Sequence, residues 1–325
     1  MIYLVFTGGT IASALNPATG SVEASVPAEE IVRQTPGLAE LGPMRVEQWG
    51  NRAGNFLGLP DMFGMAQRVR EILAEPDVEG AVLVQGTATM AETAFMSDLL
   101  LDTPKPLVVT GSMYNQSFPD SDGPRNVLNA ARVALSPEAR DMGVLVCLNG
   151  EIHAARDAMK THSMRLQTFH SFEHGLLGNA DWDRVLFYRR PVRRLHLPAP
   201  AVAEPIDVIK LVAGSDSRLI RAALATGARG IVVEALPGSG GVTPGFLDGL
   251  GEAVNQVPTI VCTDCPMGRV APVYGAGAGS RDVLSMGCLS AGDLAASKAR
   301  IFLSLALSLT EDRDRIRSWL EVLSP

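Results

Sequence analysis

A glycine-flanked turn follows the first apolar run of the chain and could carry out chemistry. The run MIYLVF, residues 1–6, is rich in strand-forming residues and leads into TGGT, residues 7–10. Two adjacent glycines let the backbone adopt conformations that are closed to other residues. In open α/β sheets, ligands bind at the carboxyl ends of the strands. The hydroxyl of Thr10 is therefore well placed to act on a ligand.

The elements that must hold this turn are predicted by a regular alternation of strand-like and helix-like runs. The strand-like runs are residues 1–6, 44–50, 80–86, 106–112 and 143–150, and the helix-like runs between them are residues 27–36, 61–75, 90–101 and 123–136. Short, continuous apolar strands are typical of strands buried on both faces, so we expect a mainly parallel sheet flanked by helices. Pro27 and Pro124 lie near predicted helix starts, and Asp61 and Ser136 are the predicted N-caps.

The alternation stops between residues 179 and 205, where the pattern indicates a strand followed by an extended linker with four prolines and a cluster of arginines. A second, smaller alternation follows and ends in a helix predicted from about residue 293. We therefore expect an α/β fold with a large N-terminal, mainly parallel sheet and a smaller C-terminal α/β domain. The predicted boundaries are 1–190 for the first domain, 191–205 for the linker and 206–325 for the second domain.

Composition limits the partners of the chain. The 325 residues carry a net charge of −7, so no basic excess exists to neutralise phosphates, and we expect no nucleic-acid partner. No apolar stretch approaches the roughly 20 residues that span a bilayer, and we expect no membrane partner. The start of the chain has no charged region or cleavage site of a secretory signal, which favours a cytoplasmic location.

Cysteines and histidines give little support for a metal site. The four cysteines lie in apolar or strand-like surroundings, as buried thiols do in a reducing compartment. Cys262 and Cys265 form a C-x-x-C pair, but no second pair at metal spacing follows. His170 and His174 are four residues apart without the intervening glutamate of an H-E-x-x-H motif. We predict no metal.

Four ordered segments together resemble the bacterial-type L-asparaginase and glutaminase family. They are TGGTIA (7–12), QGTATMAETA (85–94), GSMYNQSFPDSDGPRNVLNA (111–130) and NGEIHAARDAMKTHS (149–163). The resemblance continues through LSAGDLAASKARIFLSLAL (289–307) and thus covers essentially the whole chain. It implies the asparaginase fold, no cofactor, and a homodimer or homotetramer whose active sites lie between a large domain and a neighbouring small domain.

The resemblance also implies the chemistry, which is hydrolysis of a small-molecule amide through a threonine acyl-enzyme. Thr10 falls on the family's nucleophile, Thr87 on its second catalytic threonine, and Lys160 on the lysine beside it. The trio is physically reasonable, because a threonine hydroxyl is a poor nucleophile until a neighbour takes its proton, and a desolvated lysine can be that base. The implied substrate-binding residues are Gly9, Gly54, Asn55, Gly86 and Ala88.

The recognition residues depart from the family pattern. The family segment usually reads HGTDT, whereas residues 85–89 read QGTAT, so Ala88 replaces an aspartate that helps to hold the substrate α-ammonium. A family serine falls on Gly54, and an asparagine of the smaller domain falls on Gly241. Leaving an ammonium desolvated without a charge partner costs several kcal/mol.

Three functions stay open from the sequence. The default is hydrolysis of L-asparagine to L-aspartate and ammonia, with Asp120, Asp122 or Glu151 among the groups that could replace the missing carboxylate. The second is an amidase for an asparagine-like substrate without a free α-amino group. The third is a non-catalytic relative that binds a ligand. Asp122 itself, in DSDGP, is a typical turn and cap residue.

Overall fold

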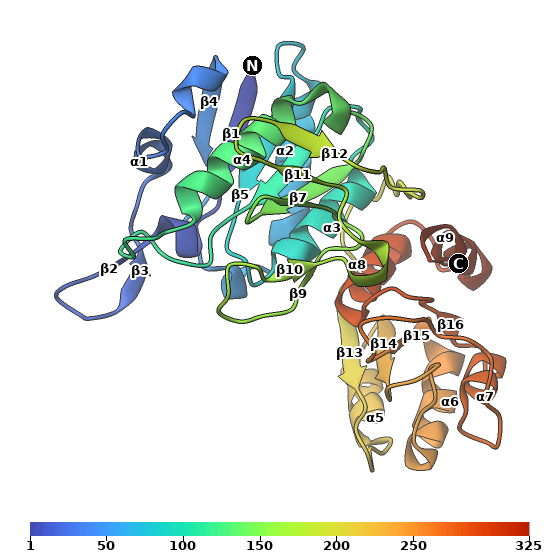
Figure 1. The fold of residues 1–325 in the computed structure, drawn as a ribbon. Coiled ribbons are helices and arrows are strands. Elements are labelled where there is room, and N and C mark those ends of the chain that lie inside the picture. The colour runs from blue at the N-terminus through green and yellow to red at the C-terminus, as the bar shows by residue number, and fades with distance from the viewer. Residues whose placement is uncertain (325) are drawn as a thin grey trace. The chain divides into compact units, whose positions relative to one another are not determined.

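The computed structural model describes residues 1–324 and divides the chain into two compact units (Figure 1). The first unit is Met1–Val192, and the second begins at Arg193. The proposed domain boundaries, 1–190, 191–205 and 206–325, remain our division of the chain, and the last residue of the second domain, Pro325, lies outside the described residues.

Within the described residues, eight strands of the first unit form one sheet in the order β12-β11-β8-β7-β6-β5-β1-β4. Neighbours from β4 to β7 are parallel, and β8, β11 and β12 are added antiparallel to one edge. The strands are β1 (Ile2–Phe6), β4 (Met44–Gln48), β5 (Gly80–Val84), β6 (Leu107–Thr110), β7 (Val144–Leu148), β8 (Glu151–Ala154), β11 (Gly178–Ala180) and β12 (Val185–Phe187). The predicted large, mainly parallel sheet is confirmed.

The register of the central strands brings three turns to one level. Phe6, the last residue of β1, pairs with Gln48 of β4 on one side and with Val84 of β5 on the other. Every residue of β1 and β5 is buried, because both faces of these strands are covered. The segments that leave β1, β4 and β5 therefore start side by side at the carboxyl edge of the sheet.

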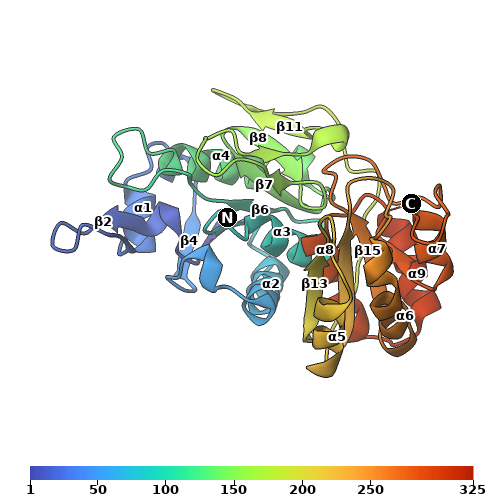
Figure 2. The same cartoon turned by 90° about the horizontal axis from the view of Figure 1, so that it is seen from below.

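Helices cover both faces of this sheet. They are α1 (Ala28–Arg33), α2 (Leu59–Ala74), α3 (Met90–Leu100) and α4 (Gly123–Leu135). Figure 2 shows α4 on one side of the strands and α2 and α3 on the other. Alternate residues of β1, such as Leu4 and Phe6, share a core with the apolar face of α4, which includes Val127 and Ala131. The expected helices flanking the sheet are therefore present.

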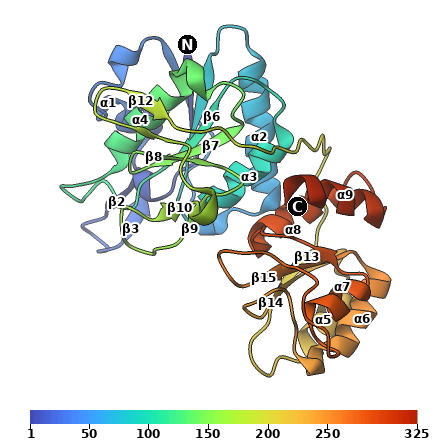
Figure 3. The ribbon, with the colours of Figure 1, turned by 45° about the vertical axis from the view of Figure 1, so that its right-hand side comes forward.

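Two short hairpins extend from the carboxyl edge of the sheet, as Figures 1 and 3 both show. The first pairs β2 (Ser13–Leu15) with β3 (Val22–Ala24), and the second pairs β9 (Met159–Lys160) with β10 (Phe169–His170). The second hairpin carries Lys160 directly opposite Phe169. Neither hairpin was predicted, since strands of two or three residues give almost no periodicity.

One of the two predicted N-caps needs correction. Helix α2 begins at Leu59 after Gly58, and Asp61 is its third residue, whose carboxylate accepts a hydrogen bond from the Gly58 N–H at 2.9 Å. Asp61 thus stabilises the helix start from inside the first turn, as acidic residues do there. Ser136 is the C-cap of α4 and, as predicted, an N-cap residue, that of the 3-10 turn Pro137–Ala139, although its side chain makes no capping bond.

The second unit has its own sheet and core. Its strands are parallel in the order β13-β14-β15-β16, and they are β13 (Ile206–Lys210), β14 (Gly230–Ala235), β15 (Thr259–Thr263) and β16 (Leu289–Ser290). Its helices as far as Ser324 are α5 (Arg218–Ala225), α6 (Leu247–Gln256), α7 (Ser280–Ser285), α8 (Ala296–Leu307) and α9 (Arg313–Leu323). The helix predicted from about residue 293 corresponds to α8, and α9, which follows it, was not predicted. The smaller α/β domain is confirmed.

Candidate active site

The turn that carries Thr10 is packed backbone to backbone against two other loops. Gly8 and Gly9 have φ angles of +102° and +88°, which side-chain-bearing residues rarely adopt. A Cβ on Gly9 would lie 2.3 Å from the Cα of Gly86, and one on Gly8 would lie 2.5 Å from the backbone nitrogen of Arg52. The two glycines are therefore required both by conformation and by the close approach of the loops.

Thr10 is the first residue of a 3-10 turn, Thr10–Ala12, directly after Gly9. It is partly exposed, and among residues 1–324 its side chain makes no hydrogen bond. The Oγ of Ser13, three residues on, donates to the carbonyl oxygen of Gly9 at 2.8 Å and so holds the turn. The Thr10 hydroxyl is left available to a ligand.

Lys160 and Thr87 form a direct pair. Lys160 Nζ donates a hydrogen bond to Thr87 Oγ1 at 2.7 Å, although the two residues are 73 positions apart in sequence. Thr87 is buried, and it follows Gly86, the residue that contacts Gly9. The structure therefore joins the predicted Thr87 and Lys160, and it brings the loop of Thr87 against the turn of Thr10.

Burial lowers the pKa of the Lys160 ammonium from its ordinary value. No carboxylate forms an ion pair with this lysine in the part of the chain that the structure describes. Since no opposite charge compensates for the lost hydration, a larger fraction of the amine is neutral at a given pH than for an exposed lysine. A neutral amine can accept a proton from a hydroxyl, as a general base must.

The predicted recognition residues Gly54, Gly86 and Ala88 lie together. Gly54 is buried at the start of a 3-10 turn, and a Cβ placed on it would lie 3.3 Å from the carbonyl oxygen of Gly86 and 3.4 Å from the Cβ of Ala88. Asn55 is the next residue of the same turn and is exposed. The cluster offers backbone polar groups and a methyl group, and its own side chains carry no charge.

A buried amide beneath this cluster escaped the sequence analysis. Gln85 is fully buried, and its Nε2 donates to Thr89 Oγ1 at 3.0 Å and to Thr93 Oγ1 at 2.9 Å. Thr89 in turn donates to the carbonyl oxygen of Gly54 at 3.1 Å. Thr89 also occupies the N-cap position of α3. The four-residue spacing of Gln85, Thr89 and Thr93 was the signal in the sequence that could have predicted these hydrogen bonds.

Asp122 holds the loop that follows β6. Its carboxylate accepts hydrogen bonds from the N–H groups of Met113 and Tyr114, at 3.0 and 2.9 Å, and from Asn126 Nδ2 at 2.8 Å. The turn and cap interpretation of Asp122 is thereby favoured over a role as an ammonium-binding group. Within the loop, the sulfur of Met113 lies 3.5 Å from Thr87 Oγ1, which the sequence did not predict.

Thiols and histidines show no sign of a metal centre. Burial raises the pKa of the Cys147 and Cys288 thiols to about 12, so both stay protonated at neutral pH. Burial also raises the pKa of Cys262, whereas Cys265 is partly exposed. As far as the described residues extend, no three histidine, cysteine or acidic side chains are grouped to bind a metal ion.

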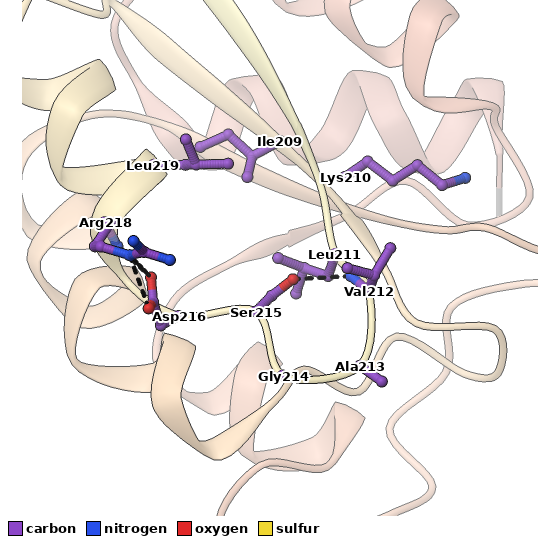
Figure 4. A pocket seen from close by; sticks show the side chains of 10 residues that line it. All are labelled: Ile209, Lys210, Leu211, Val212, Ala213, Gly214, Ser215, Asp216, Arg218 and Leu219. Atoms are coloured by element: carbon purple, nitrogen blue, oxygen red, sulfur yellow. Dashed lines mark hydrogen bonds and ion pairs between the residues drawn. The ribbon is translucent and has the colours of Figure 1, made fainter.

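Two cavities lie outside this cluster. One, of about 400 Å³, is formed in the second unit by residues 209–216, 218 and 219, at the carboxyl end of β13 (Figure 4). Its charged groups are paired, since Arg218 Nε donates to both carboxylate oxygens of Asp216 at 2.9 and 3.0 Å. The other, of about 550 Å³, is in the first unit and is lined by Pro36, Gly37, Ser121, Pro124, Arg125, Leu128, Arg132 and Trp182.

A helix crosses a bilayer only if it is long enough and sufficiently apolar. From Met1 to Ser324, none is long and apolar enough to cross a membrane.

The mainly parallel sheet, with a lysine–threonine pair at its carboxyl edge, defines an α/β protein whose candidate active site holds an amine and hydroxyl groups. The family model "Asparaginase, N-terminal" matches residues 1–193, and "Glutaminase/Asparaginase C-terminal domain" matches residues 205–320. The chain therefore belongs to the asparaginase family.

Relatives and a solved structure agree with this assignment over the full chain. "L-asparaginase 2" of Bacillus subtilis is 31% identical over 98% of this chain and 85% of its own length. "Glutaminase-asparaginase" of Acinetobacter glutaminasificans is 29% identical over 98% of both chains. The crystal structure of a probable cytoplasmic L-asparaginase from Campylobacter jejuni superposes with a TM-score of 0.90 at 27% identity, over 99% of both chains.

Proposed function

We propose that the chain is an asparaginase-like amidohydrolase that converts L-asparagine to L-aspartate and ammonia. Membership of the asparaginase family and relatives named L-asparaginase support the reaction class. The observation that carries the chemistry is the 2.7 Å hydrogen bond from Lys160 Nζ to the buried Thr87 Oγ1. A lysine whose pKa is lowered by burial, in contact with a hydroxyl beside the Thr10 turn, is suited to receive the nucleophile's proton.

In the first half-reaction, Thr10 Oγ attacks the carboxamide carbon of the substrate. The hydroxyl proton leaves through Thr87 to Lys160 Nζ, and the C–N bond then breaks as the departing nitrogen takes up a proton to leave as ammonia. Backbone N–H groups at Ala88 and in the Thr10 turn stabilise the oxyanion of the tetrahedral intermediate. The product of this step is an ester on Thr10.

In the second half-reaction, water attacks the ester carbon and transfers a proton to the same base. The C–O bond to Thr10 breaks, aspartate leaves, and the threonine hydroxyl is restored. The mechanism needs no metal or cofactor, since its acid–base work is done by the lysine and two hydroxyl groups.

Substrate recognition follows from the uncharged cluster of Gly54, Gly86 and Ala88, together with Gly9 and Asn55. With alanine at position 88, the substrate α-ammonium must rely on uncharged acceptors, and the carbonyl oxygen of Gly86 is one of them. We assign the binding of the ammonium to backbone carbonyl oxygens. This assignment predicts weaker binding than a carboxylate would give, because a carboxylate would add the attraction of an opposite charge to the hydrogen bond.

We also propose that the protein works in the cytoplasm as a homodimer or homotetramer. The support is the family resemblance and the neighbour from Campylobacter jejuni, which is described as cytoplasmic. Light scattering coupled to size-exclusion chromatography distinguishes the two assemblies, and a purely monomeric species would contradict the proposal.

The first experiment measures ammonia release by the purified protein from L-asparagine, D-asparagine, L-glutamine and N-acetyl-L-asparagine. Thr10→Ala is the blank. Turnover of L-asparagine that is lost in the blank is the expected result. Turnover of the N-acetyl compound alone would overturn the assignment of the substrate, and equal rates in wild type and blank would overturn the role of Thr10.

A further inference from the structure

The hydroxyl of Thr87 sits between two unequal partners. Among the described residues, Lys160 Nζ lies 2.7 Å from Thr87 Oγ1, and the sulfur of Met113 lies 3.5 Å from it. A hydroxyl has one proton and can accept at its lone pairs. While Lys160 is charged it can only donate, so the proton of Thr87 must point toward the sulfur.

The position of this sulfur is fixed by the loop around it. The N–H of Met113 donates to both carboxylate oxygens of Asp122, at 3.1 and 3.0 Å. Asn126 Nδ2 bonds the same carboxylate at 2.8 Å and the carbonyl oxygen of Gly111 at 2.9 Å. The backbone of Met113 is thus tied to the start of α4, and its side chain is directed at Thr87.

A thioether is a weak acceptor, and this weakness matters for a proton relay. When Lys160 is neutral, the lone pair of its amine is a much stronger hydrogen-bond acceptor for the Thr87 hydroxyl than the sulfur of Met113. The Thr87 proton can then turn from sulfur to nitrogen at little cost. A carbonyl or carboxylate in place of the sulfur would hold the proton too strongly, and a hydrocarbon would leave it unsatisfied in the charged state.

Resting on the function proposed above, we propose that Met113 is a positioning residue for the base. It holds the Thr87 proton while Lys160 is charged and releases that proton to Lys160 Nζ when the amine is neutral. In the reaction, Thr87 Oγ1 then passes its proton to Lys160 Nζ as it takes the proton of Thr10. Met113 itself does not contact the atoms of the amide in this scheme.

The proposal makes the acceptor at position 113 a determinant of the charge state of Lys160. Met113→Leu removes the acceptor at similar volume, so it disfavours the charged lysine and lowers its pKa. Met113→Gln supplies a carbonyl oxygen, so it favours the charged lysine and raises its pKa. A change in packing alone is not expected to shift the pKa of Lys160 in opposite directions for two substitutions at one position.

The test uses the small number of lysines in the chain, which are Lys105, Lys160, Lys210 and Lys298. The intact protein is labelled with a trace of acetic anhydride across a range of pH, and the extent of acetylation of each lysine is read by peptide mass spectrometry. Only the neutral amine reacts, so the profile for Lys160 gives its pKa. Lys210, which is exposed and distant in sequence, is the internal reference in each sample.

We expect the pKa of Lys160 to fall by about 0.5 in Met113→Leu and to rise by a similar amount in Met113→Gln, since hydrogen bonds of this kind have modest net strength. Met90→Leu is the matched control, because Met90 is buried beside Gly111 and is not a partner of Thr87. The profile of Lys160 should be unchanged in this control.

Unchanged profiles in both Met113 variants, or shifts of the same sign in both, would overturn the proposal. If Met113→Leu does not fold, the rise in Met113→Gln decides it. Labelling needs no substrate and no turnover. A wild-type protein that releases no ammonia would therefore count against the proposed function, while the labelling profiles would still decide the link between Met113 and Lys160.

Discussion

At the scale of single residues, the site depends on a lysine that has lost part of its hydration and gained only a neutral partner. Charged groups lose stabilisation on burial, and an opposite charge nearby normally compensates. For Lys160 the nearest donor–acceptor contact is a hydroxyl, so its pKa is lowered by burial alone. The fold thus maintains an amine that can lose its proton closer to neutral pH.

This shift predicts the direction of the pH dependence of activity. Because only the neutral amine accepts a proton, kcat/KM should rise with pH through the pKa of Lys160 and level off above it. The rise should occur below about 10.4, the ordinary lysine value, since burial lowers this pKa. Steady-state rates of ammonia release measured across pH give the midpoint directly.

Lys160→Arg tests the same role, because a guanidinium stays charged and cannot act as the base. We expect a loss of at least about 100-fold in kcat, the usual contribution of a general base. Lys105→Arg is the control, since the Nζ of Lys105 bonds the carbonyl oxygen of Glu75 outside the site. Similar activity in the two variants would refute the assignment of Lys160 as the base.

Thr10, Thr87 and Lys160 could be named from sequence because each lies in a distinctive motif. The bond between Lys160 and Thr87 follows from no local spacing, because it depends on a two-residue strand that pairs Lys160 with Phe169. Met113 was missed for a different reason. A methionine after a buried strand is usually a core residue, and only three-dimensional contacts reveal an acceptor role.

At the scale of elements, the site is assembled by parallel strands that end at one level. The pairing of Phe6 with Val84 places the turn after β1 against the loop after β5. The sequence predicted both strands, since each is a continuous apolar run. It could not predict how closely the turns pack, which depends on the absence of a Cβ on Gly9 and Gly86.

Gly9→Ala should therefore lower the activity by more than backbone strain alone would. Gly9 has φ and ψ of 88° and −167°, and its Cβ would fall 2.3 Å from the Cα of Gly86. Separating the two loops would displace Thr10 from Thr87, and misplacement by about 1 Å can cost 100-fold in rate. We expect that loss in kcat/KM, together with a lower Tm by calorimetry.

Gly42→Ala is a close control for this prediction. Gly42 has nearly the same backbone angles, 108° and −163°, but nothing lies within 4 Å of its Cβ position. The Gly42→Ala variant should lose about 1–3 kcal/mol of stability from backbone strain and keep its activity. If both variants lose activity equally, the close approach of the Gly9 and Gly86 loops is not what positions Thr10.

At the scale of the whole molecule, the chain is two α/β units that each bury a separate apolar core. In the first unit the core surrounds β1, β5 and β6, and in the second it surrounds β14 and β15. The sequence predicted this division from a break in the alternation. A strand was predicted in the segment that holds β12, but the antiparallel addition of β8, β11 and β12 to the first sheet was not, because these strands have only four, three and three residues.

The segment between the units should be the first site of limited proteolysis. Arg193 and Arg194 are exposed next to Val192, which is 92% exposed, and they lie in no helix or strand. Proteases act where the backbone can adapt to their active site. Brief trypsin treatment followed by intact-mass spectrometry should give two fragments that divide near residue 193. Each fragment keeps its own core and should resist further cleavage.

Arg218 provides the comparison, because its side chain is 88% exposed but stands at the start of α5. Early cleavage there, or an Arg193→Gln, Arg194→Gln double variant that is cut just as fast, would contradict a boundary at this segment.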